Sequence, residues 1–318
     1  MHAKRELSDC GRSLALELLK ENYSRISTRL LLAQVKNFSV RIHGFNKVSP
    51  FSGLHCASFF GIVEVVAGLI EMECYDINAG DYWGYGPLAW AARNGHEGVV
   101  EILLGRGEIS PDKPNNGGQT PLSFAAGGGH EGVVKILLGL EEVNPDGPDN
   151  HGRTPLSHAA RWGHEGVTKM LLEREEVNPD GPDNFGRTPL SWAAEEGEEA
   201  AVKILLGREE VDPDKPDDDG LTPLSYAAEN GFEGVVKILL RLERVNPDKP
   251  DNFGRTPLSY AAWYGSEEVV KILLGREEVD PDKPDNDGKT PLWYATSNGH
   301  KRAAELLQSH KEVSPSTI

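Results

Sequence analysis

Apolar residues recur along this chain at two periods, a helical one and a much longer one. In residues 217–248, Leu224, Ala227 and Ala228 are spaced i, i+3 and i+4, which predicts a short helix with one buried stripe. A wider apolar face follows and predicts a second helix that begins at Glu233. This second face consists of Val235, Val236, Ile238, Leu239 and Leu240. The pattern therefore predicts two amphipathic helices in tandem.

Special residues mark the ends of these helices. Thr222 can cap the first helix, because its hydroxyl accepts a free amide, and Pro223 suits the first helical position. Gly231 supplies the left-handed residue that ends this helix. Its equivalents are Gly95, Gly129, Gly163, Gly197, Gly265 and Gly299. After the second helix, residues 245–252 contain two prolines and turn-forming residues, which predict an extended hairpin.

This unit of helix, turn, helix and hairpin recurs every 34 residues. The marker prolines are Pro87, Pro121, Pro155, Pro189, Pro223, Pro257 and Pro291, and a degenerate copy lies at 53–57. One such unit cannot bury both of its helices, so its neighbours must supply the core, and the chain is expected to form an all-α solenoid. The predicted array covers residues 51–318, with units near 51–82, 83–116, 117–150, 151–184, 185–218, 219–252, 253–286 and 287–318.

Residues 1–50 do not match the repeat. Leucine and isoleucine spacing predicts two short amphipathic helices near 6–21 and 25–36, followed by an irregular connector over 37–50. We expect the two helices to form an N-terminal cap over the apolar end of the solenoid. A separate binding role for this segment is the alternative. The second helix of the last unit is more polar than the others, as expected for a C-terminal cap.

The repeated motif resembles the ankyrin repeat. The matching pattern is Gly-x-Thr-Pro-Leu-x-x-Ala-Ala-x-x-Gly-His, followed by Val-Val-x-x-Leu-Leu and then Val-Asn. Its first part reads GRTPLSHAARWGH at 152–164. Two features depart from the usual pattern: serine replaces the histidine that follows Pro-Leu in five units, and a Pro-Asp-x-Pro hairpin lengthens the unit. With these departures, the chain looks like the ankyrin arrays of fungal NACHT-type and related intracellular proteins.

Charge and cysteine content narrow the classes of protein. The chain has 33 Lys and Arg against 50 Asp and Glu, a formal charge of −17. Such an acidic surface repels phosphate groups, which argues against nucleic acid and against anionic membranes as partners. The three cysteines form no CxxC pair, which fits a reducing compartment. No stretch resembles a signal peptide or a membrane span. We expect a soluble monomer in the cytoplasm, with the nucleus as the open alternative.

Several motifs resemble chemical sites but fail on a required residue. Gly-Lys-Thr at 288–290 resembles part of a P-loop, but the motif requires glycine where Lys283 stands. The acidic turns at 217–220 and 285–288 lack the ligand spacing of calcium loops. No cofactor, metal or catalytic residue is therefore predicted, and the chain is not expected to be an enzyme.

Two repeating series of polar residues are also expected to be structural. One histidine recurs in four of the eight units, and we expect it to form hydrogen bonds between neighbouring units rather than to bind a metal. Its members are His96, His130, His164 and His300. One serine recurs close to the threonine cap, whereas a catalytic serine would be singular and would have its own base. The serine series comprises Ser123, Ser157, Ser191, Ser225 and Ser259.

Function is expected at the positions that differ between units, of which there are three sets. The resemblance places the first set against the next repeat, with exposure as the alternative; its members are Trp90, Phe124, His158, Trp192, Tyr226, Tyr260 and Tyr294. The other two sets are the hairpin tips and the ends of the first helices, which by resemblance line a concave groove for partners. They are rich in Trp, Tyr and Arg, which dominate interface energetics. The predicted partner-binding residues are Tyr82, Trp83, Tyr85, Arg93, His151, Arg153, Arg161, Trp162, Phe185, Arg187, Phe253, Arg255, Trp263 and Tyr264.

The sequence therefore predicts non-catalytic protein–protein recognition by a scaffold or adaptor. The acidic surface favours a partner of basic or mixed charge. A second hypothesis is that the array is the ligand-sensing part of a fungal immune-type or signalling protein. A third is an enzyme with its active site in the groove, which a pocket holding a strongly shifted titratable pair would support.

Overall fold

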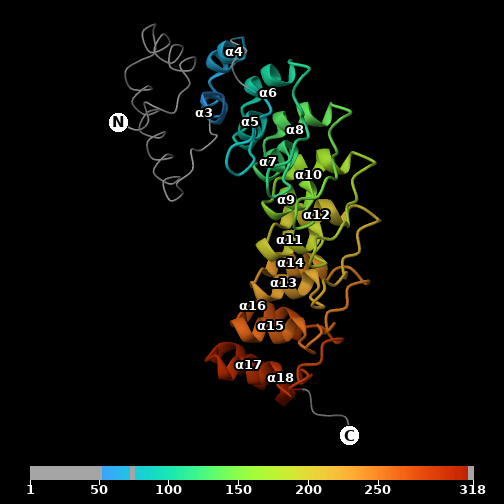
Figure 1. Cartoon of the computed structure of the whole chain (residues 1–318). Coiled ribbons are helices and arrows are strands. Elements are labelled where there is room, and N and C mark those ends of the chain that lie inside the picture. Colours follow the sequence, from blue (N-terminus) through green and yellow to red (C-terminus); the bar gives the residue numbers. More distant parts are fainter. Residues whose placement is uncertain (1–51, 72–75, 314–318) are drawn as a thin grey trace, which may run out of the picture. The chain divides into compact units, whose positions relative to one another are not determined.

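The computed structural model describes residues 52–71 and 76–313, and within these ranges the regular elements are all α-helices (Figure 1). The predicted all-α class is therefore confirmed. The predicted N-terminal cap, with its helices near 6–21 and 25–36 and its connector, lies outside the described residues.

The helices come in pairs, one pair to each repeat. The first helices are α3 (Gly53–Phe60), α5 (Pro87–Arg93), α7 (Pro121–Gly127), α9 (Pro155–Arg161), α11 (Pro189–Glu196), α13 (Pro223–Glu229), α15 (Pro257–Tyr264) and α17 (Pro291–Ser297). The second helices are α4 (Val63–Glu71), α6 (Glu97–Leu104), α8 (Glu131–Leu138), α10 (Glu165–Leu172), α12 (Glu199–Leu206), α14 (Glu233–Leu239), α16 (Glu267–Leu274) and α18 (Lys301–Val313).

The chain divides into two compact units, residues 1–150 and residues 151–318. In the first unit, α5 packs between α3 and α7, and α6 packs between α4 and α8. The same order holds in the second unit, where α11 packs between α9 and α13, and α12 between α10 and α14. Within each unit, first helices thus stack on first helices and second helices on second helices, which is the repeat-on-repeat packing of a solenoid.

Local chemistry sets the helix ends as predicted. The Thr222 hydroxyl accepts a hydrogen bond from the Ser225 amide at 3.2 Å, and both side chains are fully buried. Pro223 occupies the first helical turn, where no amide donor is needed. Gly231 has φ +74°, and the equivalent glycines of the other seven repeats, Gly61 included, also have positive φ. The serine series is therefore structural, as expected.

Buried leucine, valine and alanine side chains form the core of each unit. Leu224, Ala227 and Ala228 on α13 have no exposed surface, and neither do Val235 and Leu239 on α14. Full burial of one leucine stabilises the fold by about 2 kcal/mol, and the same positions are buried in successive repeats. The predicted stripes are thus the surfaces that neighbouring repeats cover.

The recurring histidines link repeats, as predicted for His96 and His130. The His96 Nε2 atom lies 2.9 Å from the Phe59 carbonyl oxygen, and His130 Nε2 lies 3.0 Å from the Arg93 carbonyl oxygen. The ring of His130 passes so close to Gly95 that a Cβ atom there would lie 2.5 Å from His130 Nδ1. Glycine is required at that position both for its φ and for this space.

Candidate protein-interaction surface

Each hairpin tip is held by the side chain of one residue, which is an aspartate in most repeats. In the repeat that begins near 253, Asp251 Oδ1 accepts hydrogen bonds from the amides of Phe253 and Arg255 at 2.9 and 2.8 Å. The tip also bonds the next tip, because the Asn286 amide donates to the Phe253 carbonyl oxygen at 2.9 Å. A Cβ atom at Gly254 would lie 2.7 Å from Asn286 Oδ1, so glycine permits this close approach. The tips are therefore rigid platforms.

The other oxygen of that carboxylate reaches the first helix, nine residues along the chain. Tyr226 donates its hydroxyl proton to Asp217 Oδ2 at 2.5 Å, and Tyr260 donates to Asp251 Oδ2 at 2.6 Å. Trp90 Nε1 donates to Asp81 in the same way at 3.1 Å. The pKa of both tyrosines lies well above the ordinary value for tyrosine. Burial is the larger cause, and the hydrogen bond to the carboxylate is the second.

The large side chains of the first helices are buried whether or not they form this link. Seven such positions, from Trp90 to Tyr294, are at most 9% exposed. The packing interpretation of the first set is thus confirmed, and exposure is excluded. Sequence reasoning missed the Asp–aromatic link, although one signal was present: the unit with Phe124, which has no donor, carries Asn115 in place of the aspartate.

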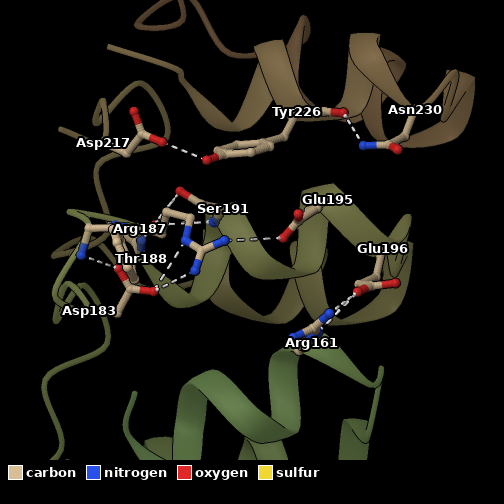
Figure 2. A network of polar contacts seen from close by, with 11 residues as sticks. Arg161, Asp183, Arg187, Thr188, Ser191, Glu195, Glu196, Asp217, Tyr226 and Asn230 are labelled. Atoms are coloured by element: carbon tan, nitrogen blue, oxygen red, sulfur yellow. Dashed lines mark hydrogen bonds and ion pairs between the residues drawn. The ribbon is translucent and has the colours of Figure 1, made fainter. Parts of the chain in front are cut away.

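Two of the predicted arginines, Arg161 and Arg187, lie over the indole of Trp192. Figure 2 shows both arginines with their carboxylate partners Asp183, Glu195 and Glu196. The Arg187 guanidinium lies 3.7 Å from the centroid of Trp192 and forms ion pairs with Asp183 at 3.2 Å and with Glu195 at 3.8 Å. The Arg161 guanidinium lies 4.5 Å from the same ring. Cations over an indole face are attracted by its ring electrons.

Carboxylates neutralise both arginines in this cluster. Arg161 donates from Nε and Nη2 to one oxygen of Glu196 at 3.0 and 2.8 Å, across to the next repeat. Burial raises the pKa of Glu195, while Arg187 and Arg161 lower it, and the net shift is upward. Arg255 repeats the arrangement, with an ion pair to Asp251 at 2.8 Å. All three arginines therefore form ion pairs within the protein, so their charges are already neutralised.

The aromatic residues of the tips and helix ends differ from these arginines in their exposure. The most exposed are Phe185, Phe253, Trp162, Tyr264, Tyr82 and Trp83, at 42–55%. We call this set the tip–helix aromatics. His151 is also exposed, and Arg153 is half-buried.

Two of the predicted partner-binding residues, Trp263 and Tyr85, pack against neighbouring aromatic rings. Trp263 is half-buried and stacks on Tyr294 with centroids 4.7 Å apart and planes 12° apart. Tyr85 lies 4.8 Å from Trp90 and 4.9 Å from Phe124. Both rings therefore pack against other side chains of the protein and are less available to a partner.

One exposed aromatic residue escaped the sequence analysis. Trp293 is 45% exposed, although it occupies the position of the buried serines in five other repeats. Among the described helices, α17 contacts α15 and α18, so no further first helix covers this side of α17. The break in the serine series was the signal that could have revealed it.

Neither the described cavity nor the clusters of acidic, histidine and cysteine side chains in this part of the chain indicate other chemistry. A cavity of about 10 Å³ lies among Ile77, Leu88 and Ile109, which is at the lower limit for one water molecule. Residues 52–71 and 76–313 hold no group of three or more His, Cys, Asp or Glu side chains suited to a metal ion. None of the helices in these ranges has the length and apolar character needed to cross a bilayer.

Comparison with known families and proteins agrees with this architecture. A model of three ankyrin repeats matches residues 107–181, 175–247, 190–282 and 241–317, and a single-repeat model matches 83–116. The chain is 33% identical over 78 residues to Late expression factor 3 of Orgyia pseudotsugata multicapsid polyhedrosis virus, covering 24% of this chain and 21% of that protein.

A second similar protein is Transient receptor potential cation channel subfamily A member 1 of Homo sapiens. It is 36% identical over 74 residues, which cover 23% of this chain and 6% of the channel. The chain thus spans less than a quarter of either relative. The more specific resemblance to fungal NACHT-type arrays stays a prediction.

Proposed function

Because the chain belongs to the ankyrin repeat family, whose repeats are generally protein-interaction modules, we propose that it is a non-catalytic scaffold or adaptor. It binds its partner protein through the tip–helix aromatics, at the surface where sequence analysis expects a groove. The observation that carries this proposal is the exposure of these large rings, at 42–55%, on two sets of positions that vary between repeats.

The rigidity of the tips supports this proposal. The Phe253 amide is bonded to Asp251 and its carbonyl oxygen to the Asn286 amide, so the backbone that presents the ring is already ordered. A partner that covers the ring gains apolar burial and loses little conformational entropy. Aromatic side chains on ordered backbone are typical interface anchors.

Electrostatics favours a partner of basic or mixed charge in the second unit. Asp218 and Asp219 are exposed on the tip between those of Phe185 and Phe253. Arg187 and Arg255 are already paired with Asp183 and Asp251, so they do not offset this acidic tip. A lysine or arginine of the partner placed between two apolar contacts would complement the surface.

The shifted titratable pairs do not favour the enzyme hypothesis. The tyrosine–aspartate pairs at 226 and 217 and at 260 and 251 recur in successive repeats as parts of the same turn. The described cavity of about 10 Å³ lies elsewhere, in the first unit. Repetition as a fold element supports a structural role for these pairs.

The test is quantitative affinity capture with three matched variants. Trp162→Ala with Phe185→Ala, and Phe253→Ala with Tyr264→Ala, each remove two exposed rings from the second unit. Trp293→Ala is the control, because it removes an exposed ring outside the tip–helix aromatics. Trp263 is left unchanged because it stacks on Tyr294.

We expect both double variants to keep the wild-type circular dichroism spectrum and to bind their captured partners at least about tenfold more weakly, the effect of roughly 1.4 kcal/mol. The Trp293→Ala control should retain them. Partners that remain bound to every tip variant would show that binding uses another surface.

A further inference from the structure

In the first unit, we infer that Arg93 recognises a carboxylate of the partner protein. This inference rests on the proposed function and adds the chemistry of one contact. Arg93 ends helix α5 and is exposed. Its tip carries Tyr82 and Trp83, whose rings lie 5.6 Å apart.

The comparison with Arg161 carries the inference. Arg93 and Arg161 occupy the same repeat position, two periods of 34 residues apart. Arg161 is neutralised by Glu196 at 2.8 Å. Two periods before Glu196 stands Gly128, which has no side chain. The position that supplies the carboxylate for Arg161 therefore supplies none for Arg93, and the imidazole of His130 lies beside Gly128 instead.

Aromatic rings hold the Arg93 side chain in place without neutralising it. Its guanidinium carbon lies 5.7 Å from the centroid of Tyr85 and 5.8 Å from those of Trp90 and Phe124. Nη1 donates to the Tyr85 hydroxyl at 3.1 Å. Among the residues that the structure describes, no carboxylate lies within ion-pair distance of Arg93. The cation is thus ordered and uncompensated.

The neighbouring sequence contains no competing acid. Residues 82–96 and 115–130 carry one formal charge between them, that of Arg93. Asp81, just before this stretch, is buried and bonds Trp90 and the amides of its own turn. Glu97 and Glu131, which directly follow these stretches, begin α6 and α8, and among the described residues neither forms an ion pair with Arg93.

An exposed guanidinium without an internal ion pair is best suited to bind a carboxylate. Its planar donors form two parallel hydrogen bonds with one carboxylate, which gives direction as well as charge pairing. Tyr82 and Trp83 on the tip of the same repeat are suited to an apolar neighbour of that acid. The partner segment at the first unit therefore presents an acidic residue next to an apolar one, whereas the acidic tip of the second unit favours a basic residue.

A heptapeptide library tests this inference on the full chain. N-acetylated, C-terminally amidated heptapeptides of random sequence are selected against wild type, Arg93→Gln, Arg93→Lys and Arg106→Gln. Arg106 is the matched control, because it is an exposed arginine of the first unit outside the proposed surface. A second library with free C-terminal acids separates a side-chain carboxylate from a chain end.

We expect peptides bound to wild type and to Arg106→Gln to be enriched in Asp or Glu beside an apolar residue. In the tightest peptide, Asp→Asn should weaken binding to wild type by about tenfold and to Arg93→Gln by less than about twofold. Arg93→Lys should keep part of the preference, since it retains the charge without the planar fork.

Three results would overturn the inference, and they differ in what they say of the proposed function. Peptides that depend on Trp83, carry no acidic preference and bind Arg93→Gln as well as wild type would remove the carboxylate contact and leave partner binding intact. If no heptapeptide binds while protein capture by the tips succeeds, the inference fails alone. If both fail, the proposed function fails with it.

Discussion

Removing one phenol oxygen from the repeat at 219–252 tests how the tips are held. Tyr226 donates to Asp217 Oδ2 at 2.5 Å, and the position that carries Arg255 in a later repeat is Leu221 here. Tyr226→Phe keeps the ring but leaves that half-buried carboxylate oxygen without its side-chain donor. A hydrogen bond to a charged group contributes about 1.5–3 kcal/mol. We expect the free energy of unfolding to fall by about 2 kcal/mol.

Tyr260→Phe is the matched comparison. Its acceptor, Asp251 Oδ2, also receives Arg255 Nε at 2.8 Å, so a charged donor remains after the phenol is removed. We expect a loss of at most about 1 kcal/mol, close to that of an ordinary hydrogen bond. Tyr260 is the more buried of the two tyrosines, at 5% against 9%, so an argument from burial alone predicts the opposite order.

The chain itself suggests a rescue. Where the helix carries Phe124, the tip carries Asn115, whose Oδ1 still accepts from the amides of Gly117 and Gln119 at 2.9 Å. Combining Tyr226→Phe with Asp217→Asn reproduces that pair. We expect the double variant to recover about 1 kcal/mol or more of the loss, as a coupling energy between contacting residues.

Urea denaturation followed by circular dichroism measures these differences. Repeat arrays unfold with limited cooperativity, so native-state hydrogen exchange at the Asp219 and Leu221 amides provides the local reading. Equal losses for Tyr226→Phe and Tyr260→Phe, or an added loss from Asp217→Asn in the double variant, would refute the assigned role of the charged acceptor.

Three further outcomes follow from single contacts. Gly147→Lys should stabilise the fold by about 0.5–1 kcal/mol relative to Gly147→Gln in urea denaturation. The reason is that, among the described residues, the half-buried Asp112 accepts only the Asn144 amide, at 3.3 Å, whereas Lys249 and its equivalents form an ion pair with the aspartate one repeat before. His55 is buried, and burial lowers its pKa. Its contribution to stability is therefore present above pH ~6.5 and is lost as the pH falls. The stability lost between pH 7 and pH 5 should be smaller in His55→Gln than in the wild-type protein. Burial raises the pKa of the Cys56 thiol to about 11, so its alkylation by iodoacetamide, followed by peptide mass spectrometry, should be much slower in native than in urea-unfolded protein.

The repeat architecture was predictable because its signals are local. Thr222 caps the helix that it precedes, and Gly231 ends that helix with its own φ. Each determinant lies within a few residues of its effect and recurs every 34 residues. Periodicity therefore identified the helices, their ends and the core without knowledge of how repeats stack.

The state of the candidate site was less predictable, because contacts across repeats decide it. Sequence reasoning placed Trp162 and Trp263 in one class, yet Trp263 stacks on Tyr294 of the following repeat and Trp162 is 53% exposed. Arg161 finds its acid 35 residues away, on a helix end that no local pattern connects to it. The type of residue indicated a binding surface, but its neighbours determine which side chains are available.

The same reasoning identifies where a repeat protein can gain specificity. The repeats share the same turn and helix interactions. A functional difference arises where a side chain lacks the interaction partner that the residue at the same position of another repeat has. Arg161 with Glu196 and Arg93 with Gly128 form such a contrast within one chain. A glycine in place of the glutamate is compatible with the same repeat fold. It leaves the arginine as an exposed cation instead of one half of an internal ion pair, and a carboxylate of the partner protein can then form the ion pair.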